Sequence, residues 1–62
     1  MNISTEELIK DRLEILTNQH HWAVRRYTEK PSVNNLREIN NLLAKIEELN
    51  WVLSIIEGAE DE

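Results

Sequence analysis

The stretch YTEKPSV, residues 27–33, decides how this chain folds. Pro31 is the one proline in the sequence, and a helix cannot continue through it because proline lacks a backbone N–H and clashes with the preceding turn. The residue before it, Lys30, is pushed out of the helical region as well. Ser32 is a favoured N-cap for a helix that begins directly after it. The stretch therefore predicts the end of one helix, a short break and the start of a second helix.

Apolar residues recur at alternating steps of three and four on both sides of this break, as one face of a coiled-coil or bundle helix requires. The row before the break consists of Ile9, Leu13, Leu16, His20, Ala23 and Tyr27. The row after it consists of Leu36, Ile39, Leu43, Ile46, Asn50 and Leu53. We therefore predict an all-α fold, an antiparallel two-helix hairpin in which these rows face each other. Asn50 is a polar residue in an apolar row, and we expect it to specify register or oligomeric state.

Local signals set the expected ends of the two helices. Ser4 and Glu7 have the spacing of a capping box, which predicts a helix start after Ser4. Gly58 suits the left-handed residue that ends many helices. The predicted organisation is a single domain over residues 1–62, with a first helix over about 5–29, a turn over 30–32, a second helix over about 33–57 and an acidic tail over 58–62.

Each predicted helix carries more apolar surface than one neighbour can cover. The second apolar rows are Leu8, Ile15 and Trp22 on the first helix and Leu42, Leu49 and Ile56 on the second. An exposed apolar stripe usually marks an interface. We therefore expect a homodimeric four-helix bundle, with a higher oligomer or a heterologous partner as the alternatives. The expected oligomer seam consists of Leu13, Leu16, His20, Ile39, Leu43, Ile46, Asn50 and Leu53.

The charges are distributed unevenly along the chain. Arg25, Arg26, Lys30 and Arg37 cluster around the break, whereas acidic residues gather toward the two ends of the sequence. Folding at the break brings both acidic ends together and leaves the turn basic. Two antiparallel hairpins would then place each basic turn beside acidic ends of the partner. The net charge of −5 argues against nonspecific binding to nucleic acid or to a membrane.

Trp22 and the basic residues near it form the candidate surface for a ligand or partner. Arg25 and Arg26 lie three and four positions after Trp22, so both can flank the indole on one helix. An aromatic ring among arginines can stack a nucleic-acid base, but protein interfaces are also enriched in Trp and Arg. We prefer the interpretation that Trp22 and these arginines belong to a protein interface. The candidate surface consists of Trp22, Arg25, Arg26, Lys30 and Arg12.

The sequence shows no pattern of catalytic or metal-ligating residues. His20 and His21 are the only histidines, and neither has a second histidine four positions away, as helical metal motifs do. The absence of cysteine excludes disulfides and thiolate metal sites. Gly58 is the single glycine, so there is no glycine-rich phosphate loop. We therefore expect no enzymatic activity, no catalytic residue, no metal and no cofactor.

In length, acidic tail and hairpin layout the chain resembles the Rop-type RNA-binding hairpins that control plasmid copy number. The resemblance implies an antiparallel four-helix dimer that binds paired RNA loops through basic residues of its first helices. The matching basic residues here are Lys10, Arg12, Arg25 and Arg26.

The chain also resembles the short two-helix aspartyl-phosphate phosphatases of sporulation control. Their signature, S-Q-E-L-D, falls on Leu36-Arg37-Glu38-Ile39-Asn40, where only Glu38 and Ile39 agree with it. Asn40 stands in the place of the working aspartate. This resemblance implies the two-helix fold and not the phosphatase activity.

Taken together, these patterns predict a small non-enzymatic regulatory or assembly protein that acts by protein–protein binding as a homo-oligomer. Rop-like binding of RNA or a nucleotide through the first helix is the alternative. We expect a cytoplasmic protein with no membrane contact, because no stretch approaches the roughly 20 apolar residues that cross a bilayer. Glu6 and Glu7 near the start do not fit a secretion signal. An accessory protein of a phage or plasmid fits this size.

Overall fold

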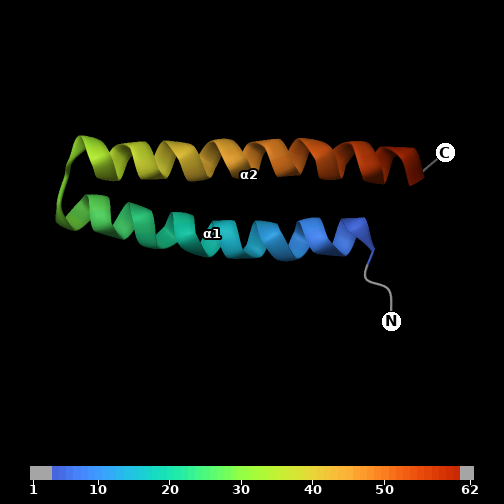
Figure 1. The fold of residues 1–62 in the computed structure, drawn as a ribbon, viewed down its shortest axis with the longest axis horizontal. Helices are drawn as coiled ribbons and strands as arrows, with labels where there is room; N and C mark the ends of the chain where they lie inside the picture. The colour runs from blue at the N-terminus through green and yellow to red at the C-terminus, as the bar shows by residue number, and fades with distance from the viewer. Residues whose placement is uncertain (1–3, 61–62) are drawn as a thin grey trace.

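The computed structural model describes residues 4–60 and has two helices, α1 (Thr5–Glu29) and α2 (Val33–Glu60). The helices lie side by side and antiparallel, so the start of α1 and the end of α2 lie at the same end of the hairpin (Figure 1). The molecule measures 47 × 24 × 12 Å. Its shortest dimension is about that of one helix with its side chains, about 10–12 Å. The fold is therefore a single layer of two helices, which confirms the predicted all-α hairpin.

The first helix begins and ends where local chemistry requires it. The Ser4 hydroxyl accepts a hydrogen bond from the backbone N–H of Glu7 at 3.1 Å, as an N-cap does. At the other end, Lys30 leaves the helical region with φ −140° and ψ 86°, because Pro31 follows it. The N–H of Lys30 still donates to the carbonyl of Arg26 at 2.8 Å and closes the last turn.

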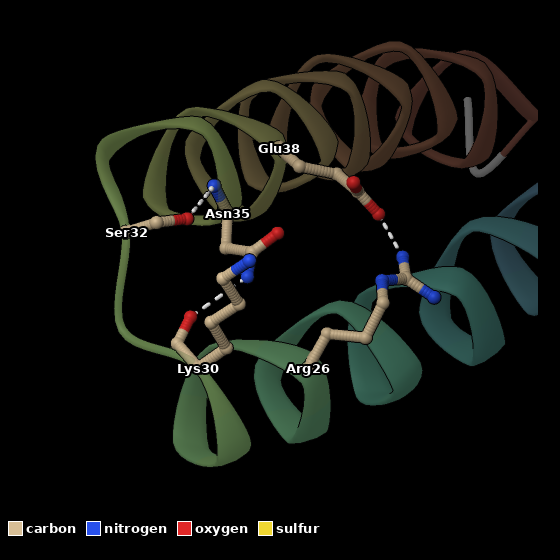
Figure 2. A network of polar contacts seen from close by, with 5 residues as sticks. All are labelled: Arg26, Lys30, Ser32, Asn35 and Glu38. Atoms are coloured by element: carbon tan, nitrogen blue, oxygen red, sulfur yellow. Dashed lines mark hydrogen bonds and ion pairs between the residues drawn. The ribbon is translucent and has the colours of Figure 1, made fainter.

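A pair of side-chain hydrogen bonds holds the turn between the helices (Figure 2). The hydroxyl of Ser32 accepts from the backbone N–H of Asn35 at 3.1 Å, so Ser32 caps α2 as predicted. The side-chain amide of Asn35 donates to the carbonyl of Lys30 at 2.8 Å. Asn35 therefore ties the first turn of α2 to the last residue before Pro31.

The second helix is longer than predicted. It continues to Glu60 rather than ending at residue 57, and no described glycine or other residue has a positive φ. Gly58 ends a helix only where its backbone adopts the left-handed conformation, and its φ is not positive in this structure. Residues 58–60 of the expected acidic tail are thus helical, and residues 61–62 lie outside the described part of the chain.

The core between the helices is small. Leu16 and Ala23 of α1 are 2% and 1% exposed, and Leu42 of α2 is 8% exposed. On α1 the row that faces α2 is the predicted one, since its other members are half-buried. These are Ile9, Leu13, His20 and Tyr27. The residues packed against this core from α2 are Ile39, Ile46 and Leu49.

On α2 the row that faces α1 differs from the prediction. Ile39, Ile46 and Leu53 face α1 as expected, but Leu42, Leu49 and Ile56 complete the row in place of Leu36, Leu43 and Asn50. Leu43 is 41% exposed, and Asn50 is exposed as well. The predicted row and the observed row of α2 both contain Ile39, Ile46 and Leu53, and they differ in which neighbouring residues complete them. The observed rotation leaves the Asn50 amide exposed on the hairpin, so it is not buried without a partner against α1.

Neither helix, over the residues that are described, has the length and apolar character that a membrane-spanning segment needs.

Candidate functional site

An ion pair marks one side of the two-helix layer. The guanidinium of Arg26 on α1 contacts the carboxylate of Glu38 on α2 (Figure 2). Successive helical residues are turned by 100°. From Ala23 in the core, Val24 is one step away and Arg26 is three steps away, so they flank the helix contact on opposite sides. Val24 therefore lies on the side of the layer opposite the ion pair.

The same geometry divides α2. From Leu42 in the core, Leu43 is one 100° step away, while Lys45 is three steps away and lies on the other flank. Glu38, one turn before Leu42, lies on the flank of Lys45. Leu43 therefore shares a side of the layer with Val24, and Lys45 shares the side of the ion pair.

We name each of the two sides by one of its exposed apolar members, Trp22 or Leu43. The Trp22 face consists of Arg12, Ile15, Gln19, Trp22 and Arg26 of α1 with Glu38, Lys45, Glu48 and Val52 of α2. The Leu43 face consists of Val24 of α1 with Leu36, Leu43 and Asn50 of α2. Trp22, Arg12 and Arg26 thus lie on one surface, whereas Leu43 and Asn50 of the expected oligomer seam lie on the opposite one.

Two open grooves follow one another along the Trp22 face. The first has a volume of about 520 Å³, and its walls include Ile15, Gln19, Trp22, Arg26 and Glu38. The second has a volume of about 310 Å³, and its walls include Arg12, Lys45, Glu48 and Val52. The floors are leucines of the helix contact, Leu42 in the first groove and Leu16 and Leu49 in the second. Both grooves therefore offer an apolar floor between charged rims.

Trp22 is in contact with its neighbours on α1 and is 55% exposed. The guanidinium carbon of Arg25 lies 5.2 Å from the centre of the indole ring, within the range of a cation–π contact. The ring of His21 meets the indole edge-on, with centroids 5.5 Å apart. Arg26, expected to flank Trp22 as well, lines the same groove but pairs with Glu38.

The structure places the rest of the candidate basic surface apart from Trp22. Arg12 lines the second groove rather than the first. Lys30 forms the end of α1 at the turn, and its side chain is exposed. The fold therefore brings together Trp22, Arg25 and Arg26, puts Arg12 farther along the same face, and leaves Lys30 at the end of the layer.

The Leu43 face is apolar around Val24, Leu36 and Leu43. Its charged residues are the ion pair of Glu6 with Lys10 and Glu57, toward the end away from the turn, and Glu47 at its outer border. Val24, Leu36 and Leu43 are 39%, 43% and 41% exposed. Half-buried members of the expected oligomer seam border this face. They are Leu13, His20, Ile39, Ile46 and Leu53. Leu16, which was also expected in that seam, is 2% exposed, and α2 already covers it.

Several exposed apolar residues were not singled out as surface candidates from the sequence. Val24 belongs to neither apolar row of α1, although its position one step after Ala23 is the signal that places it on this side. Val33, Trp51 and Ile55 are 65%, 66% and 51% exposed. Trp51 lies on the outer side of α2, two residues past Leu49, away from the contact with α1.

Within residues 4–60, no group of three or more His, Asp or Glu side chains lies close enough to hold a metal ion. No family model, curated protein or solved structure matches this chain. The functional argument therefore depends on the chemistry of the two faces.

Proposed function

We propose that this chain is a small non-enzymatic regulatory or assembly protein that works by binding other chains. A second copy covers the Leu43 face and forms a homodimeric four-helix bundle, and a different protein binds the Trp22 face. One observation carries the proposal: large apolar side chains remain exposed on both sides of a layer that is one helix thick. Each hairpin of a two-layer bundle has only one face inside, so one dimer contact leaves the other face available.

The small core supports association. Of the described residues only Leu16, Ala23 and Leu42 are buried, whereas nine large apolar side chains are 39% to 66% exposed. A single core in a chain of this size supplies about 3–5 kcal/mol at most. Burial of one large aliphatic or aromatic side chain contributes about 1.5–3 kcal/mol. Covering a few of the exposed side chains would therefore stabilise the fold by an amount comparable to its own core.

The Leu43 face is the better candidate for the centre of a bundle. Over its middle, its apolar residues come with neutral polar neighbours such as Thr17 and Asn50, and the ion pair of Glu6 with Lys10 and Glu57 lie on this side only near the end away from the turn. The Trp22 face carries Arg12, Lys45 and Glu48, and the burial of these charges costs far more than the burial of neutral groups. A dimer on the Leu43 face leaves those charges in water.

The charges also favour an antiparallel arrangement of the two hairpins. Glu6 and Glu7 lie in the first turn of α1 and Glu57 in the last turn of α2, at one end of the layer, while Arg25 and Arg37 lie near the turn at the other end. A parallel dimer would put like charges at the same end. An antiparallel dimer puts each basic turn beside the acidic end of its partner, which favours association through long-range attraction.

Two contacts support protein binding over Rop-like binding of RNA or a nucleotide. Arg25 lies over the indole ring of Trp22, so it competes with any base that would stack there. The charge of Arg26 is compensated by Glu38. Both contacts reduce what the basic surface offers to a phosphate backbone, and they leave the apolar grooves as the larger feature of this face.

Sedimentation equilibrium of two neighbouring charge variants tests the proposal. Leu43→Glu places a carboxylate on the Leu43 face, and we expect a single chain with reduced helical circular dichroism. Ala44→Glu is the matched control, because Ala44 is exposed on the outer side of α2, and we expect it to remain dimeric. A Leu43→Glu protein that dimerises as tightly as the control would contradict the proposed dimer contact.

A measurement of RNA binding at several salt concentrations tests the alternative function. RNA binding that weakens steeply with salt and is lost in Arg25→Glu/Arg26→Glu would replace protein binding by the RNA-binding function. If the chain binds protein, we expect it not to bind RNA. We also expect it to bind one specific protein, and we expect the Trp22→Ala variant to lose that binding.

A further inference from the structure

The Trp22 face is basic on an acidic protein. Its cations are Arg12, Arg26 and Lys45, and its anions are Glu38 and Glu48. Three cations against two anions give the walls of the two grooves a net charge of +1, whereas the whole chain carries −5. Since Glu38 is paired with Arg26, the cations beside the second groove, Arg12 and Lys45, face only Glu48 among the residues that line it. An incoming partner therefore meets a locally positive surface.

The two grooves are spaced like the side chains of a helix. The α1 residues that line the first groove run from Ile15 to Arg26, and those that line the second are Arg12 and Leu16. The centres of these sets differ by about six residues, roughly 9 Å along the helix axis. Side chains one heptad apart on a partner helix are separated by about 10.5 Å. One helix lying along α1 could therefore place an apolar side chain into each groove.

We propose that the protein bound by the Trp22 face supplies an acidic amphipathic α-helix. This proposal rests on the protein-binding function proposed above and names the class of its partner. The apolar row of the partner helix fills the two grooves, against Leu42 in the first and against Leu16 and Leu49 in the second. Recognition of an amphipathic helix in an apolar groove is a common mode of peptide binding.

The charged residues at the rims of the grooves determine which charge the partner helix must carry. Carboxylates beside its apolar row would lie near Arg12 and Lys45 on the second groove and near Arg25 beside Trp22. A basic helix of the same shape would meet those cations with unfavourable charge. The charge arrangement therefore sets specificity, while the apolar floors contribute most of the contact area.

The probe for this proposal is a synthetic helical peptide of about 18 residues, or five turns, with leucines along one face and glutamates on both flanks. A second peptide carries lysines in place of the glutamates, and a third has the composition of the first with its apolar face scrambled. The Trp51→Phe protein leaves Trp22 as its one tryptophan, because the chain has two. We expect a change in Trp22 fluorescence with the first peptide and binding roughly tenfold weaker or worse with the other two.

Matched variants localise the binding to the Trp22 face. With binding followed by the anisotropy of a fluorophore on the glutamate peptide, Trp22→Ala is expected to weaken binding roughly tenfold or more, whereas Trp51→Ala, at a residue of similar exposure, leaves it unchanged. The double variant Arg12→Glu/Lys45→Glu is expected to reverse the preference and favour the lysine peptide. Lys30→Glu, at the turn and outside the walls of both grooves, is the charge control and keeps the original preference.

Four results would overturn the proposal. Three of them are an absence of saturable binding by the glutamate peptide, equal binding of the lysine peptide, and RNA binding in place of either peptide. A wild-type tetramer that Trp22→Ala converts to a dimer would also overturn it, because the occupant would then be a second copy of this chain. Sedimentation of the same samples separates these failures from failure of the dimer: a protein that stays dimeric retains the self-association proposed above.

Discussion

Leu42 and Leu43 are adjacent in the sequence and lie on different surfaces of α2. Leu42 is 8% exposed and belongs to the contact with α1, whereas Leu43 is 41% exposed on the Leu43 face. One helical step of 100° thus separates the core of the hairpin from the surface proposed to bind a second copy. Substitutions at neighbouring positions can therefore distinguish folding of one chain from association of two.

Truncation of Leu16 is expected to unfold the hairpin. Leu16 is 2% exposed, and replacement of such a residue by alanine typically costs about 2–5 kcal/mol. That loss is as large as the stability expected for so small a core. Ile15→Ala, the neighbouring control at 47% exposure, should cost much less. Urea denaturation followed by circular dichroism measures both, and equal losses would contradict the assignment of the core.

Removal of the Asn35 side chain is expected to loosen the turn. Asn35→Ala deletes the hydrogen bond to the carbonyl of Lys30, and we expect a loss of about 1 kcal/mol. Asn34→Ala removes the adjacent, exposed amide and serves as the control. Thermal denaturation should separate the two variants, and an equal effect would show that the amide of Asn35 does not fasten the helices together.

The hairpin itself could be predicted because its signals are local. Pro31, Ser32 and Ser4 act through the backbone next to them, and the structure confirms the cap of each helix at the expected serine. The row of α1 that faces α2 could be predicted as well, because the sizes of its side chains favour it over the second row. The second row of that helix holds the bulky Trp22, which cannot approach a neighbouring helix as closely as Ala23 can.

The rotation of α2 could not be predicted from the sequence. Leu42 and Leu43 each continue a heptad row through Ile39 and Ile46, so periodicity fits both choices equally. The choice depends on how the side chains of α2 pack on α1, and on whether Asn50 meets water. The extension of α2 through Gly58 escaped prediction because glycine permits a left-handed helix end without requiring one.

The candidate surface was predictable only in part, for the same reason. The contact between Trp22 and Arg25 follows from their spacing on one helix. The partner of Arg26 is Glu38 on the other helix, and no local rule pairs residues across the turn. The division of the candidates onto two faces likewise required the register between the helices.

Replacement of Asn50 tests the specificity role assigned to it. In the proposed dimer Asn50 lies in the interface, so Asn50→Leu is expected to raise the melting temperature and to allow more than one oligomeric state. Asn41→Leu, on the other flank of α2, is the control and should leave the oligomeric state unchanged. Sedimentation velocity measures the distribution of species, and identical behaviour of the two variants would remove Asn50 from the interface.

Single cysteines test the orientation of the two hairpins, and the natural chain has none to interfere. In an antiparallel dimer α2 packs on α2 of the partner, so one of the variants Leu36→Cys, Leu43→Cys and Asn50→Cys lies near the two-fold axis. We expect that variant to form a disulfide with its own copy under mild oxidation. In a parallel dimer α2 packs on α1, and disulfides would instead require a mixture of Val24→Cys with Leu43→Cys.

Sedimentation equilibrium of the unmodified chain at micromolar concentration tests the central claim most directly. We predict a species with the mass of two chains, and we predict that dilution to single chains is accompanied by loss of the helical circular dichroism signal. A fully helical single chain at every concentration would contradict the account, because the exposed residues of the Leu43 face would then need no partner.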